Sequence, residues 1–141
     1  MRKIATAFLI LFLAACSSTK KTAGTLPLYE VLTSKSDGGG NIRFYEVVST
    51  SDEFRMLLGD ENLKRKIKPD DINSANFIIL NMGEKRSGGY SIDVEKVEET
   101  ADKIVVTVKE TKPDEDSMTT QAITYPYAIV KINSKKTIEI K

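Results

Sequence analysis

The sequence predicts an α+β domain: a mainly antiparallel β-sheet of about six to seven strands with one short helix packed on it. Seven segments are enriched in the β-branched and aromatic residues that favour strands. Only one stretch combines a helix-start pattern with apolar residues at helical spacing. The connections between consecutive strands are too short for the crossovers that parallel neighbours require, so the strands should pair antiparallel.

The first segment of the chain has the pattern of an export signal. Arg2 and Lys3 precede an apolar run over residues 4–13, which ends in small residues. The run is about ten residues long, whereas a helix needs ~20 to cross a bilayer. Residues 13–16, Leu-Ala-Ala-Cys, resemble the bacterial lipobox, in which diacylglycerol is attached to the Cys and the chain is cut before it. We therefore expect Cys16 to be the lipid attachment site.

This cleavage divides the chain into three parts. Residues 1–15 form the signal peptide, 16–24 the lipidated Cys with a small, polar, flexible spacer, and 25–141 the folded domain. Lipid chains supply ~0.8 kcal/mol per buried methylene, so the tether does not depend on the fold. Ser17 is not acidic, which favours an outer-membrane position facing the periplasm. The expected location is the bacterial cell envelope.

The folded domain should open with a β-hairpin. Segments 28–33 and 42–48 read as strands, and the residues between them, 36–41, contain three consecutive glycines. Such a stretch has the backbone freedom of a turn.

One short helix should follow this hairpin. Thr50 and Glu53 form a capping-box pattern, in which each side chain accepts from the other residue's backbone amide. Phe54, Leu57 and Leu58 then recur at helical spacing and define the buried side.

A basic run comes next, made of Lys64, Arg65, Lys66 and Lys68. It fits a solvated helix face, and it also fits contact with anionic lipid headgroups, because the tether keeps the domain near a membrane.

The rest of the chain reads as a meander of five strands: 77–82, 90–97, 104–110, 122–133 and 137–140. In the second and third of these, apolar and polar residues alternate, so one face of each should be buried. The expected core consists of Phe54, Leu57, Leu58, Phe77, Ile79, Ile92, Val94, Ile104, Val106, Ile129 and Ile132.

The composition excludes several classes of function. Processing removes two basic residues, which leaves 19 basic (21 minus 2) against 20 acidic residues, so bulk attraction to nucleic acid is not expected. The chain has no His, and its single Cys is the expected lipid attachment site. Intrachain disulfides, Ser-His-Asp and Cys-His catalysis, and zinc sites are therefore excluded, and no cofactor is expected.

Two kinds of functional site, a calcium site and a Ser-Lys catalytic pair, remain compatible with the composition. Asp114, Glu115 and Asp116 offer oxygen ligands for calcium, but the EF-hand spacing is missing and a solvated hairpin tip accounts for them. Ser87 and Lys85 are a possible Ser-Lys pair, although neighbours in a glycine-rich turn are poorly preorganised for catalysis. We expect neither a metal site nor an enzyme.

Two segments together resemble a known family. Residues 81–92 run from a strand into a basic turn that ends in Gly-Gly-Tyr, and residues 124–132 place Pro-Tyr before an Ile-Val run. This order of parts is similar to the PrcB C-terminal domain family. The resemblance covers about residues 67–133; the family's usual lead-in is loosened at 68–77, and the N-terminal hairpin lies outside it.

The resemblance implies a non-catalytic role. The family takes its name from a lipoprotein subunit of a bacterial surface protease complex, where it supports assembly or stability of the protease. By resemblance, this chain is an envelope lipoprotein that binds another protein, possibly a protease, through its sheet edge and the Gly-Gly-Tyr hairpin. The candidate partner-binding residues are Gly88, Gly89, Tyr90, Tyr125, Pro126 and Tyr127.

A purely structural interpretation of the same residues also stays open. Gly88 and Gly89 can serve only to form the turn, the tyrosines can be core aromatics, and Pro126 can mark an edge strand or a bulge. A protease inhibitor or small-ligand module is the alternative function, with the loops at 38–40 and 85–89 as its elements. The sequence leaves open the identity of the partner, the membrane and leaflet, the oligomeric state and any small ligand.

Overall fold

The computed structural model describes residues 26–141. The predicted signal peptide (1–15), and Cys16 with the whole spacer (16–24), fall within residues 1–25 and lie outside the described residues. The elements are β1 (Tyr29–Lys35), β2 (Arg43–Val48), α1 (Ser51–Leu58), a 3₁₀ helix η1 (Pro69–Asn73), β3 (Asn76–Met82), β4 (Ser91–Glu99), β5 (Lys103–Thr111), β6 (Tyr127–Ile132) and β7 (Thr137–Ile140).

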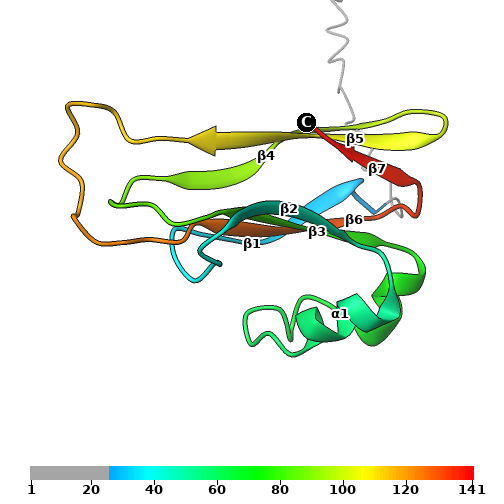
Figure 1. Cartoon of the computed structure of the whole chain (residues 1–141). Coiled ribbons are helices and arrows are strands. Elements are labelled where there is room, and N and C mark those ends of the chain that lie inside the picture. Colours follow the sequence, from blue (N-terminus) through cyan, green and yellow to red (C-terminus); the bar gives the residue numbers. More distant parts are fainter. Residues whose placement is uncertain (1–25) are drawn as a thin grey trace, which may run out of the picture.

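These elements form three layers (Figure 1). A three-stranded sheet, in the order β4-β5-β7, lies over a four-stranded sheet, in the order β1-β6-β3-β2. The helices α1 and η1 cover the other face of the four-stranded sheet. The predicted α+β class and the seven strands are confirmed, but the strands divide between two sheets where one was expected.

The predicted hairpin of the first two strands is wrong. β1 pairs with β6, and β2 pairs with β3, so two strands separate them in the sheet. Nearly every residue of β3 and of β6 is buried, whereas β1 and β2 bury only a few. The apolar strands need cover on both faces and take the centre, and the amphipathic strands take the edges.

The meander is also wrong, except for the antiparallel pair of β4 and β5: β3 and β4 lie in different sheets, and the order changes again after β5. The chain leaves the three-stranded sheet, adds β6 to the centre of the other sheet, and returns as β7 to lie parallel to β5. Because β6 is part of the connection, the path from β5 to β7 is long enough for parallel pairing.

The four-stranded sheet separates two hydrophobic cores. Its helix-facing core contains Phe77 of β3, and the core between the sheets contains its neighbour Ile78. All the predicted core residues lie in one of these cores: most are fully buried, and Leu58, Ile79 and Val94 are partly buried.

The predicted helix start is confirmed. Thr50 and Glu53 form the capping box, and the ring of Phe54 stacks on that of Phe77 with centroids 4.5 Å apart. The basic run that follows α1 lies in an irregular turn with its four side chains exposed. Among residues 26–141, no helix is long and apolar enough to cross a membrane.

Candidate functional site

Three loops meet at one end of the two sheets, at the left in Figure 1. They are the glycine loop (36–42) between β1 and β2, the Gly-Gly-Tyr loop (83–90) between β3 and β4, and the long loop (112–126) between β5 and β6. Backbone hydrogen bonds connect the Gly-Gly-Tyr loop to both others. We call these residues the loop cluster.

The two segments that carry the family resemblance come together in this cluster. Lys85 and Thr124 form an isolated antiparallel bridge, with N–H···O distances of 2.8 and 2.9 Å in the two directions. The Thr124 hydroxyl donates to the Ser87 carbonyl at 2.9 Å, and the Gly88 amide donates to the Thr120 carbonyl at 2.9 Å. Segments more than thirty residues apart are therefore held as one unit.

Gly88 and Gly89 each meet the long loop at close range. A Cβ on Gly88 would lie 2.5 Å from the Thr120 hydroxyl oxygen, and one on Gly89 would lie 2.8 Å from Cβ of Pro113. Gly89 also has a φ of 87°, in the left-handed region that favours glycine. The structure thus gives both glycines a role in packing this chain on itself.

The glycine loop is held by a buried amide side chain. Asn81, near the end of β3, accepts from the Gly40 amide at 2.9 Å and donates to the carbonyls of Gly40 and Ile42 at 2.8 and 2.5 Å. Only 1% of Asn81 is exposed, so these bonds satisfy a side chain that would otherwise be costly to bury. The sequence reasoning missed this residue, whose signal is one amide within the apolar run of β3.

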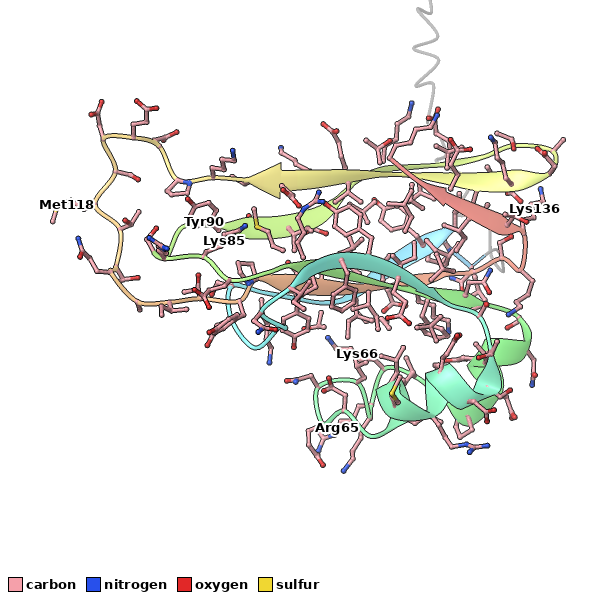
Figure 2. The ribbon with its side chains drawn as sticks, viewed as in Figure 1. Arg65, Lys66, Lys85, Tyr90, Met118 and Lys136 are labelled. Carbon is pink, nitrogen blue, oxygen red and sulfur yellow. The ribbon has the colours of Figure 1, made fainter. Side chains whose placement is uncertain are left out.

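Tyr90 and Tyr125 are both half-buried. Tyr90 packs against the core between the sheets, and the Lys85 ammonium lies 5.7 Å from the centre of its ring (Figure 2). The Tyr125 backbone is fixed on both sides: its amide donates to an Asp37 carboxylate oxygen at 3.1 Å, and its carbonyl accepts from Gly39 at 2.9 Å.

Pro126 and Tyr127 are buried where the chain enters β6. The prediction that Pro126 marks an edge strand or a bulge is wrong, because it lies directly before a central strand. It donates no ladder hydrogen bond of its own, and its carbonyl accepts from Met82 at 2.9 Å. Burial raises the pKa of Tyr127, and the charge of Asp60 adds to the rise.

A charged cluster joins the two sheets beside these loops. Tyr45 of β2 donates to Glu110 of β5 at 2.7 Å, while Arg43 donates to both groups, at 2.8 Å to Glu110 and 2.7 Å to Tyr45. Burial, together with the bond to Glu110, raises the pKa of Tyr45 to about 12. Burial alone would raise the pKa of Glu110, but the bonds from Tyr45 and Arg43 outweigh it and lower that pKa.

The loop cluster also exposes apolar side chains that the sequence reasoning missed. Ile42, Ile123 and Met118 are 71%, 56% and 104% exposed, and Phe44 at the start of β2 is 40% exposed. Figure 2 shows Met118 at the tip of the long loop, pointing away from the sheets. Only Met118 gave a signal in the sequence, as a large apolar residue outside the predicted strands; Ile42, Phe44 and Ile123 lay within predicted strands, where apolar residues are expected.

The residues considered as catalytic or calcium-binding candidates either interact with other groups or are exposed. The Lys85 ammonium lies over the ring of Tyr90, and the Ser87 hydroxyl donates to the Gly88 carbonyl at 3.3 Å. Asp114, Glu115 and Asp116 are exposed. Within the part of the chain that the structure describes, no three acidic or other metal-ligating residues are grouped to hold an ion.

Comparison with known proteins bears on this region. Residues 76–133 match the family model described as PrcB C-terminal, from the first residue of β3 to just beyond β6. The match contains the Gly-Gly-Tyr loop, the long loop and the Pro-Tyr entry to β6, and it confirms the resemblance. No curated protein and no solved structure matches the chain.

Proposed function

We propose, from the PrcB C-terminal match, that this chain is a non-catalytic lipoprotein that binds another protein. Its role is that of an accessory or stability subunit of an extracytoplasmic, protease-type complex. Cys16 carries the lipid, and the protein is anchored in the outer membrane and faces the periplasm.

The observation that carries the proposal is that the loop cluster, whose loops are held together by hydrogen bonds, exposes large apolar side chains. Loops held by backbone and side-chain hydrogen bonds lose little further freedom when a partner binds, which favours affinity. The loops of this cluster also expose several large apolar side chains, and exposed apolar surface of this kind is typical of a protein-binding site.

Composition supports a role without catalysis. The chain has no His, and its single Cys is the proposed lipid attachment site. Lys85 and Ser87, the remaining candidates for a nucleophile and its base, each interact with other groups.

The test replaces two apolar side chains of the loop cluster by aspartate. In Ile42→Asp/Ile123→Asp, recovery of partners crosslinked in intact cells should fall about tenfold or more, because buried interface anchors commonly contribute over 1 kcal/mol each. Both side chains are exposed in the free protein, so the unfolding midpoint should stay unchanged.

Met56→Asp is the matched control, because Met56 is 68% exposed but lies on α1, away from the loops. It should keep the partner. Equal recovery from the double variant and the control would contradict the proposal. If the captured protein is a protease that this chain inhibits, the alternative function applies; a protease that is more stable or more active with the chain supports the accessory role.

A further inference from the structure

The outer edge of β2 carries backbone groups without partners. Met82 donates to the Pro126 carbonyl, and backbone groups alternate in direction along an antiparallel strand, so the sides on which β2 and β3 meet follow from the register. By this alternation Arg43, Tyr45 and Val47 direct their N–H and C=O groups outward. Within residues 26–141, no hydrogen bond is made by their amides.

The opposite edge of the same sheet is protected. β1 has a register shift between Val31 and Thr33, and the Lys66 ammonium donates to the Leu32 carbonyl within that bulge. Ser34 also donates its hydroxyl to a carbonyl of β4 at 3.3 Å. Bulges and lysines at an edge are common devices against strand addition, and β2 has a regular register with neither device on its free side.

The edge strand of the upper sheet lies near the end of β2. The bond from Tyr45 to Glu110 links β2 to β5, β7 is the edge strand next to β5, and Val47 and Ile138 line the same cavity. Ile138 and Ile140 of β7 pack against the core between the sheets but remain only half-buried. Both side chains therefore keep apolar surface that an added strand would cover.

A cavity of about 390 Å³ opens at this position. Its lining joins the end of β2 to the start of β7 and consists of Val47, Ser49, Asn76, Lys135, Lys136, Thr137 and Ile138.

The cavity contains a buried acceptor without a donor. Asn76 is 4% exposed; its amide nitrogen donates to the Lys136 carbonyl at 3.2 Å, while its Oδ1 has no partner in the described chain. Lys135 donates to the carbonyls of Ser49 and Ala75 at 3.2 and 3.4 Å and makes no salt bridge with a described residue. A group that both donates and accepts would satisfy the two side chains.

We propose that the β2 edge binds an extended strand of the partner protein by antiparallel or parallel β-addition. The free N–H and C=O groups of β2 pair with its backbone, and apolar side chains of the added strand cover Val47, Ile138 and Ile140. One hydroxyl or amide side chain enters the cavity, donates to Asn76 Oδ1 and accepts from Lys135. The inference rests on the proposed function and adds where and how the partner binds.

The test removes one outward amide while the fold is kept. Val47→Pro deletes an N–H that faces away from β3, a position where an edge strand tolerates proline. Val47→Ala is the matched control, because it shortens the same side chain and keeps the amide.

Capture is measured with photo-crosslinking amino acids in the full-length protein in intact cells, placed one at a time at Phe44 on β2, at Met118 on the long loop and at Met56 on α1. Capture from Phe44 should fall at least about tenfold with Val47→Pro and less than about threefold with Val47→Ala. Met56 should capture nothing.

The outcomes separate this inference from the proposed function. Capture from Met118 that Val47→Pro leaves unchanged, with none from Phe44, overturns the strand addition and leaves the proposed function standing. Absence of capture from every position overturns both. An adduct of two copies of this chain from Phe44 overturns the heterologous partner in favour of self-association.

Hydrogen exchange on the unaltered chain gives an independent answer if Val47→Pro does not fold. In the free protein, the amides of Tyr45 and Val47 should exchange faster than those of Glu46 and Val48, which face β3. In the crosslinked complex, the Tyr45 and Val47 amides should slow at least about tenfold. Unchanged exchange at both residues would overturn the proposal.

Discussion

At the scale of single residues, the loop cluster depends on positions that have no room for a side chain. The Gly39 amide donates to the Tyr125 carbonyl at 2.9 Å, and the next residue, Gly40, is held on both its amide and its carbonyl by Asn81. The glycine loop is therefore joined both to the long loop, at Tyr125, and to β3, at Asn81.

Gly39→Ala should destabilise the domain by about 1–3 kcal/mol, the usual cost of overpacking. Its Cβ would clash with the Asn81 side chain and lie 2.8 Å from the Tyr125 carbonyl oxygen. Gly40→Ala is the control: its nearest neighbour would be 3.4 Å away, so its effect should stay within about 0.5 kcal/mol. Urea unfolding of both variants measures the difference, and equal losses would show that the close approach at Gly39 does not constrain the loop.

The sequence predicted part of this detail. Two adjacent glycines before Tyr90 indicated a turn, and Gly89 has the positive φ that glycine supplies in turns. The role of Asn81 could not be predicted, because its partners are backbone groups about forty residues earlier in the chain. Nothing in the local pattern of β3 identifies them.

At the scale of elements, local sequence signals predicted where α1 begins, but they did not predict which strands pair. The capping box gave the start of α1 correctly, since both of its residues act within one turn of helix. The hairpin of β1 and β2 was wrong because the glycine loop permits a turn without requiring that the strands beside it pair. The outcome depended on which strands had two apolar faces, and β3 and β6 displaced β2 from β1.

The link between β2 and β5 gives a measurable pH dependence. The pKa of Tyr45 in the folded protein, about 12, lies above its ordinary value of 10.0 because burial and the bond to Glu110 disfavour the phenolate. A raised pKa means that this stabilisation is complete below pH 10 and is lost as the pH rises through 12. Ultraviolet titration should show one tyrosine ionising near pH 12, and Tyr45→Phe should remove that phase.

Glu110→Gln is the informative comparison for this titration. It removes the carboxylate that accepts from Tyr45, so the same phase should remain but move toward lower pH. If Tyr45→Phe leaves the phase near pH 12 in place, and the absorbance that it removes instead titrates near the ordinary tyrosine value of 10.0, the bond between the sheets does not persist in solution.

At the scale of the whole molecule, the four-stranded sheet packs against a hydrophobic core on each face, and a different part of the proposed function is assigned to each of its ends. The chain enters the described domain beside the end of β6, where Asn133 donates to the carbonyls of Pro27 and Leu28. The loop cluster lies at the other end, where β6 begins. This entry point and the loop cluster therefore lie at opposite ends of the sheet. The cavity beside the end of β2 lies at the entry end, because its lining includes Asn76, which pairs with Ile132.

Cys16→Ser tests the anchor. Cys16 is the single cysteine of this chain and the proposed attachment point for diacylglycerol, so radiolabelled palmitate should be lost and the protein should be unprocessed or released from the membrane fraction. Ser17→Ala, next to the attachment residue, should keep the label. Palmitate that stays on the Cys16→Ser protein would refute lipidation at this site.

The opposite placement of entry point and loops sets how far from the membrane this protein can work. The six residues of β6 span about 20 Å, so this separation is fixed by the fold. The nine residues between Cys16 and Leu26 can add at most about 30 Å when fully extended. With the proposed lipid on Cys16, the start of β6, from which the loop cluster projects, would stand at most about 50 Å from the bilayer. Such confinement would raise the effective concentration of a membrane-bound partner, so that a weaker contact between the two proteins would keep them together.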